Sequence, residues 1–151
     1  MSVRHTYLFQ PGKWRAQGRY YGPQGMPVQA EGEVEIVHGP DKWENRGVMR
    51  IDKPGEREYA NVYEMQPVPR GGFSGTWTSR NPDLGEFKGK MTVVEDAIIM
   101  FSRSIDGAYE TMETLTKVSD DRYESRGVLY GAGERLSSWA VTLERESGPI
   151  S

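Results

Sequence analysis

The chain has 151 residues, the length of one domain with a sizeable hydrophobic core. Its 19 lysines and arginines against 22 aspartates and glutamates give a net charge of -3, so we expect no nucleic-acid partner. The absence of cysteine excludes disulfides, thiolate nucleophiles and cysteine metal sites, and no apolar run approaches the ~18 residues of a membrane-spanning helix. The start, MSVRHTYLFQ, lacks the apolar core of a signal peptide, which favours a cytoplasmic location.

Three segments in the first third of the chain alternate apolar or small residues with charged or polar ones. They are residues 14–20, 27–38 and 43–51. In the clearest one, 27–38, the apolar or small set is Val28, Ala30, Gly32, Val34 and Ile36. A period of two with one polar face predicts half-buried β-strands.

Seven further strands are expected, separated by turn-forming residues such as those at 52–55, 81–83 and 106–107. They cover roughly 57–66, 71–79, 85–94, 97–105, 109–118, 121–131 and 134–146. Short connections join neighbouring strands as antiparallel hairpins, and closure of the sheet removes its exposed edges. We therefore predict an all-β fold, an antiparallel up-and-down barrel of about 8–10 strands forming a single domain over 1–151. A β-sandwich is the alternative.

One motif resembles a known family. Gly12-Lys13-Trp14, which opens the first strand, resembles the Gly-x-Trp signature of the lipocalins and the wider calycin group. In that group the tryptophan seals the closed end of the barrel beneath an arginine from the last strand, and Arg145 stands near the end of the last predicted strand. The resemblance thus implies a calycin-like barrel closed at Trp14, with Arg145 over the indole in a cation–π contact.

If the first strand starts at the closed end, the mouth is formed by the loops 22–26, 52–56, 80–84, 106–108 and 132–133. The period-two faces then direct seven side chains inward near this mouth: Tyr20, Met49, Tyr59, Trp77, Arg103, Tyr109 and Trp139. An aromatic lining with few polar groups favours a pocket for a small hydrophobic or aromatic ligand. The alternative is that these rings simply fill the barrel.

Arg103 has two interpretations, which the sequence leaves open. It follows an apolar run at 97–101, and an inward guanidinium would need a partner, either a ligand carboxylate or Glu113 on the next strand. An inward Arg103 would favour a ligand with an acidic group. A shift of register by one residue would instead turn Arg103 outward.

The sequence offers little chemistry for metals or nucleophiles. His5 and His38 are too few for a three-histidine zinc site, and His38 lies in a turn at the predicted closed end, which disfavours it as a haem ligand. We therefore predict neither a metal nor a cofactor. Tyr109 and Glu113 are candidate acid–base residues, because burial in an apolar barrel would raise a carboxyl pKa toward neutrality.

Three functions remain open at this stage. The first is a non-enzymatic binder of a small hydrophobic or aromatic molecule. The second is a small barrel enzyme of the isomerase, cyclase or lyase type that acts on an apolar substrate, and the third is a filled barrel with an interaction surface. Outward residues such as Val48, Val62 and Val128 would allow a homodimer.

Overall fold

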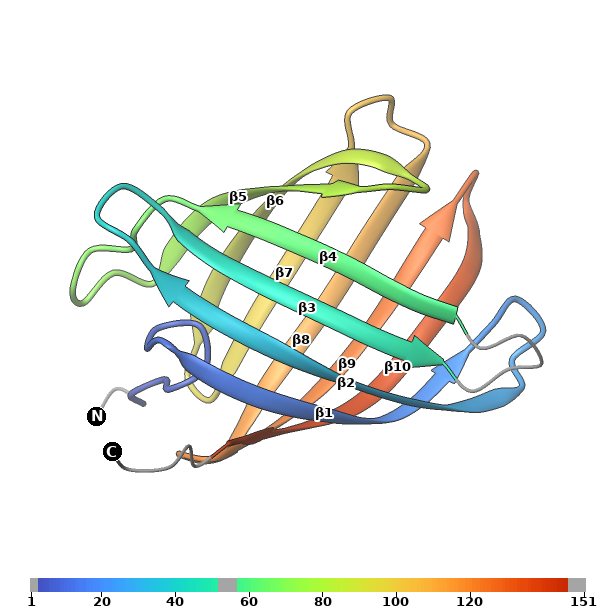
Figure 1. Ribbon diagram of the computed structural model, residues 1–151. Coiled ribbons are helices and arrows are strands. Elements are labelled where there is room, and N and C mark those ends of the chain that lie inside the picture. The colour runs from blue at the N-terminus through green and yellow to red at the C-terminus, as the bar shows by residue number, and fades with distance from the viewer. Residues whose placement is uncertain (1–2, 52–56, 147–151) are drawn as a thin grey trace.

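The protein is a closed, ten-stranded antiparallel barrel in the computed structural model, which describes residues 3–51 and 57–146 (Figure 1). The strands are β1 Gly12–Tyr21, β2 Pro27–His38, β3 Trp43–Ile51, β4 Arg57–Met65, β5 Ser74–Asn81, β6 Gly85–Val94, β7 Ala97–Ser104, β8 Tyr109–Ser119, β9 Arg122–Gly131 and β10 Glu134–Arg145. Each strand pairs with the next in sequence, and β1 pairs with β10 to close the barrel. The predicted calycin-like up-and-down barrel is confirmed, and the β-sandwich is excluded.

The strand bounds agree closely with those expected from the alternation. The largest shift is at β5, which begins at Ser74 rather than at residue 71. Here the backbone first makes a turn: Gly71 has a φ of 82°, and the Gly72 N–H donates to the Pro69 carbonyl at 2.7 Å. The predicted turn at 52–55 lies outside the described residues. No helix in the described part of the chain has the length and apolarity that crossing a membrane requires.

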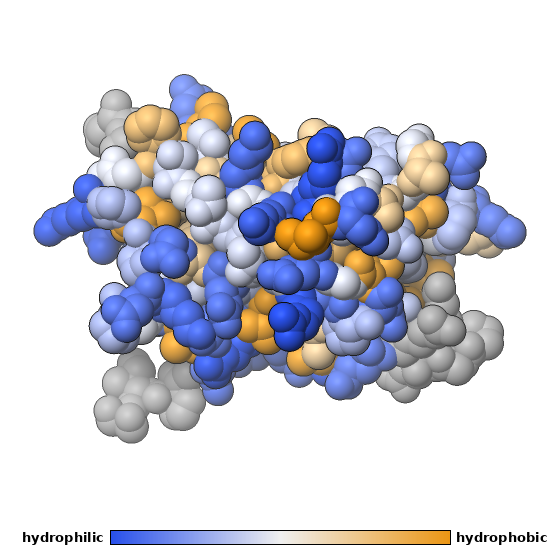
Figure 2. All heavy atoms as spheres, turned by 90° about the horizontal axis from the view of Figure 1, so that it is seen from above, coloured by the Kyte–Doolittle hydropathy of each residue, from blue (hydrophilic) through white to orange (hydrophobic). Residues whose placement is uncertain are grey.

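Alternation along the strands separates the interior from the outer face. In β7, for example, Ile98, Met100 and Ser102 point inward and are at most 5% exposed, whereas Ile99 between them is 41% exposed. Figure 2 shows one outer face, where hydrophobic residues are scattered among hydrophilic ones. The apolar side chains at the inward positions therefore form the hydrophobic core.

The N-terminal segment closes one end of the barrel. It packs under the end at which β1 starts (Figure 1), with Tyr7 and Leu8 buried. The His5 Nε2–H donates to the Glu95 carbonyl at 2.9 Å, so Nδ1 accepts the Tyr123 hydroxyl at 2.6 Å. The Tyr123 oxygen in turn accepts the Thr6 N–H at 3.1 Å. Burial lowers the pKa of His5 below its usual value of 6.5, because the interior penalises the charged ring.

Trp14 is the centre of this closed end. Its side chain is 0% exposed and meets the rings of Tyr7 and Tyr123 edge to face, at centroid distances of 5.2 and 5.7 Å. The guanidinium carbon of Arg145 lies 5.7 Å from the indole centroid, and Trp14 and Arg145 are paired in the β1–β10 register. The predicted contact between Arg145 and Trp14 is therefore confirmed, and this end of the barrel is solid.

Candidate functional site

The other half of the barrel encloses a cavity of about 450 Å³, within the size range of small-molecule pockets. Five of the seven side chains predicted to face a pocket line it: Tyr20, Met49, Tyr59, Trp77 and Trp139. Most of the remaining lining is apolar or small, including Ala16, Ala30 and Leu129. The aromatic rings therefore surround a space instead of filling it.

The two tryptophans of the cavity do not fill it, because each indole covers a glycine on the neighbouring strand. Trp139 on β10 pairs with Gly127 on β9, and a Cβ at Gly127 would lie 2.1 Å from the indole carbon Cζ2. Trp77 on β5 pairs with Gly89 on β6, where a Cβ would lie 2.2 Å from Cε2. Because each glycine has no side chain, each indole lies flat across it against the wall of the barrel.

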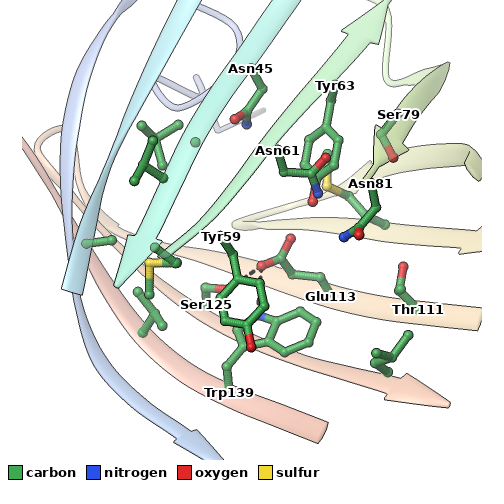
Figure 3. A pocket seen from close by; sticks show the side chains of 18 of the residues that line it. Asn45, Tyr59, Asn61, Tyr63, Ser79, Asn81, Thr111, Glu113, Ser125 and Trp139 are labelled. Carbon is green, nitrogen blue, oxygen red and sulfur yellow. Dashed lines mark hydrogen bonds between the residues drawn. The ribbon is translucent and has the colours of Figure 1, made fainter. Parts of the chain in front are cut away.

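Glu113 of β8 brings a negative charge into the cavity (Figure 3). Its Oε2 accepts hydrogen bonds from the Ser125 hydroxyl at 2.6 Å and from the indole Nε1–H of Trp139 at 3.0 Å. Trp139 can reach Glu113 from two strands away because Gly127 stands between them in the register. The glycine thus both flattens the indole and lets it hold the carboxylate in place.

The negative charge of this carboxylate acts on the phenols of Tyr7, which is buried, and Tyr63, which is partly buried. The pKa values of Tyr7 and Tyr63 are raised well above the ordinary tyrosine value, first by burial and then by the negative charge of Glu113. Both therefore stay protonated and neutral at physiological pH. Tyr7 accepts the Asn45 amide N–H at 3.0 Å, which links the closed end to the floor of the cavity.

The cavity reaches a split in the barrel wall between β4 and β5. Only Val62–Met65 of β4 pair with β5, whereas β3 pairs with β4 over its full length. The β5–β6 hairpin bends away from the start of β4 in Figure 1. Residues on both sides of this split line the cavity: Tyr59, Ala60 and Asn61 on β4, and Asn81, Asp83 and Leu84 at the β5–β6 turn. The split is therefore the candidate entrance.

Arg103 lies outside the barrel, so its predicted inward orientation is wrong. Its neighbours Ser102 and Ser104 are the inward residues, at 1% and 3% exposure, and its guanidinium donates to Glu110 on the outer face of β8 at 3.0 Å. The observed register of β7 differs by one residue from the register that would turn Arg103 inward. Outward Ile99 and Phe101 give the strand an apolar appearance on both faces, which conceals the alternation.

The expected acid–base pair is not assembled. Tyr109 stands at the mouth end of β8, packed beside Gly131, and is absent from the lining residues, whereas Glu113 is inside the cavity. The two Cα atoms lie about 13 Å apart along the strand, and no hydrogen bond joins the two side chains, since Glu113 is bonded to Ser125 and Trp139 instead. Arg103, Tyr109 and Glu113 therefore do not form one site, and of the three only Glu113 lines the cavity.

Both histidines belong to the closed end. The His38 Nε2 hydrogen-bonds with the Leu8 carbonyl at 2.8 Å, and its ring stacks on Trp43 at 3.9 Å. His5 is held by Tyr123 and Glu95. In the described residues, no three His, Asp or Glu side chains gather closely enough to hold a metal ion.

Three asparagines that line the cavity, Asn45, Asn61 and Asn81, are not among the site residues predicted from the sequence. The buried Oδ1 of Asn61 has no hydrogen-bond partner among the described residues. The signal was present in the alternation, because Asn45 shares the inward face of β3 with Met49, and Asn61 shares that of β4 with Tyr59. Polar residues on an inward face mark places where a ligand can be hydrogen-bonded.

No protein-family model matches the chain, and no curated protein matches its sequence. Solved structures do resemble it. An S-type phycobiliprotein lyase, CPES, from Guillardia theta matches with a TM-score of 0.69 at 11% identity, covering 98% of this chain and 94% of that one. Rv2717c from M. tuberculosis has a TM-score of 0.65 at 12% identity, with 95% and 99% covered. The barrel EF1p2_mFAP2b bound to DFHBI has a TM-score of 0.53 at 14% identity, with 94% and 98% covered. At these identities the likeness shows the shared fold.

Proposed function

We propose that this barrel is a non-enzymatic binder of a small hydrophobic or aromatic molecule, which it holds in the cavity of its open half. The observation that carries the proposal is the cavity of about 450 Å³ with Tyr59, Trp77 and Trp139 on its walls. Apolar ligands gain free energy from leaving water for such a surface, at about 25 cal/mol per Å² buried. The split between β4 and β5 gives the ligand a way in.

Two of the similar structures support this proposal. The EF1p2_mFAP2b barrel was solved with the small molecule DFHBI bound, and CPES is described as a phycobiliprotein lyase. The absence of a nucleic-acid partner, a cytoplasmic location and a homodimer through residues such as Val48, Val62 and Val128 remain predictions from the sequence. None of them is needed for ligand binding.

A cavity-filling variant tests the proposal. Nile red is a neutral apolar dye that becomes fluorescent when it leaves water, and we expect it to bind the wild-type protein. Ser79 is buried and faces the cavity, and its hydroxyl takes part in no hydrogen bond among the described residues, so Ser79→Phe should fill the cavity and abolish the fluorescence increase. Thr78→Phe on the exposed face of the same strand is the matched control and should bind like wild type. A wild-type protein that leaves Nile red dark would refute the proposal.

A further inference from the structure

The charged side chains that line the cavity in the described part of the chain are all acidic. They are Glu113 within the barrel and Asp83 at the β5–β6 turn, and no lysine, arginine or histidine of residues 3–51 and 57–146 lines it. A ligand that carries an anionic group would bring a second negative charge beside Glu113 with no cation to compensate it. In a partly desolvated cavity this repulsion is much stronger than in water.

The Glu113 carboxylate is held by one oxygen and leaves the other available. Both donors, the Ser125 hydroxyl and the Trp139 indole, bind Oε2, and no hydrogen bond from the described residues reaches Oε1. The indole N–H can only donate, so its contact fixes Oε2 as an acceptor. The second oxygen therefore keeps its capacity to accept a hydrogen bond from a ligand.

Two further features favour a ligand that donates hydrogen bonds and carries positive charge. The buried Oδ1 of Asn61 is a second acceptor with no partner among the described residues. Tyr59 on β4 and Trp139 on β10 line the cavity from walls that lie four strands apart around the barrel, and the Trp139 indole is hydrogen-bonded to Glu113 (Figure 3). Aromatic faces attract cations through their electron-rich surface.

We propose that the cavity selects apolar ligands whose polar end is a cationic nitrogen, a protonated amine or amidine, and that the Oε1 of Glu113 is the atom that binds it. This inference rests on the proposed function and adds the charge class of its ligand. It reverses the sequence-based expectation of an acidic ligand, which depended on an inward Arg103. The apolar body of the ligand lies among the aromatic residues, and its N–H groups face Glu113 and Asn61.

Three probes with one apolar body test this assignment. Naphthylmethylamine is cationic at neutral pH, naphthylmethanol is neutral and naphthoate is anionic, and each is titrated as a competitor of Nile red. We expect naphthylmethylamine to bind most tightly and naphthoate most weakly to the wild-type protein. This ranking needs no variant, so it stays informative even if a substitution at Glu113 impairs folding.

Two glutamates on the same strand provide matched variants. Glu113→Gln removes the charge inside the cavity and should weaken naphthylmethylamine about 10- to 100-fold, the range for a hydrogen bond to a charged group, while changing naphthylmethanol little. Glu110→Gln removes the same charge outside the barrel, where Glu110 pairs with Arg103, and should change no affinity. Near-ultraviolet circular dichroism checks that both variants keep the wild-type fold.

The outcomes separate this inference from the proposed function. Equal binding of the three probes, tighter binding of naphthoate, or an equal loss of amine and alcohol binding in Glu113→Gln would overturn the role of Glu113 while leaving a hydrophobic binder in place. The same holds if Nile red binds and naphthylmethylamine does not. If neither binds, both proposals fail.

Discussion

The two halves of this barrel use large aromatic side chains in opposite ways. At the closed end, Trp14 meets Tyr7 and Tyr123 edge to face and is fully buried. In the open half, Trp77 and Trp139 lie flat on glycines of the neighbouring strands and leave a cavity in front of them. Strand alternation is the same in both halves. Whether an inward tryptophan fills the barrel or lines it is decided by the residue beside it on the next strand.

The halves also differ in how their polar groups are satisfied. At the closed end, His5, Thr6 and Tyr123 bond to one another and to backbone carbonyls in a chain of hydrogen bonds, and the Nε1 of Trp14 is the one buried side-chain polar atom without a partner among the described residues there. In the cavity, the Asn61 Oδ1, the Glu113 Oε1 and the Trp77 Nε1 have no partner among the described residues. Buried polar atoms cost free energy when they are unpaired, so the closed end contributes stability and the open end retains binding capacity.

Truncating one tryptophan from each half gives the largest expected effect. Trp14→Ala should lower the free energy of unfolding by about 3–5 kcal/mol, because it leaves a void among tightly packed rings. Trp139→Ala should cost less, since one face of its ring already borders the cavity, but it should abolish Nile red binding. Urea unfolding measures both changes. Equal losses of stability would mean that the open half is packed as densely as the closed one.

A methyl group at Gly127 tests how the cavity is kept open. The new Cβ of Gly127→Ala would lie 2.1 Å from Trp139 Cζ2, so the indole must move off the wall and lose its bond to Glu113. Overpacking of this kind costs about 1–3 kcal/mol, and we expect weaker Nile red binding as well. Gly12→Ala is the control, because no atom lies within 4 Å of its added Cβ. Unchanged binding in Gly127→Ala would refute the role of this glycine.

The smallest expected effect is a pH dependence that comes from the closed end. The folded pKa of His5 lies below its usual 6.5, so the unfolded chain binds a proton more readily. The contribution of His5 is therefore complete above pH 6.5, and stability falls as the pH drops from there toward the lowered folded pKa. Urea midpoints measured between about pH 8 and pH 5 should show this fall, and His5→Gln, which cannot titrate, should reduce it. An unchanged pH profile in His5→Gln would contradict the assignment.

The sequence predicted the fold well because alternation and turns are local signals. The segments 27–38 and 43–51 match β2 and β3 at both ends, and the contact of Trp14 with Arg145 was implied by the resemblance of Gly12-Lys13-Trp14 to the lipocalin motif. Six of the seven side chains expected inward follow the inward alternation of their strands, and five of them line the cavity. These predictions require only that one knows which alternate residues of each strand point inward.

The charge of the site was harder to predict, because it depends on register and on contacts across strands. At β7 a difference of one residue placed Arg103 outside, and this changed the expected ligand from acidic to basic. The contact between Trp139 and Glu113 spans β9 and exists only because Gly127 lies between them. No local pattern on one strand reports such a contact. A tryptophan aligned with a glycine on the next strand is the signal that could have found it.

The most direct test of the account follows all four tryptophans at once by fluorine NMR of protein labelled with fluorotryptophan. Single Trp-to-Phe variants assign the signals, and naphthylmethylamine is then added. We expect the signals of Trp77 and Trp139 to shift while those of Trp14 and Trp43 stay in place. Shifts at Trp14 or Trp43, or no shift at Trp77 and Trp139 under saturating probe, would contradict a barrel that is solid at one end and binds its ligand at the other.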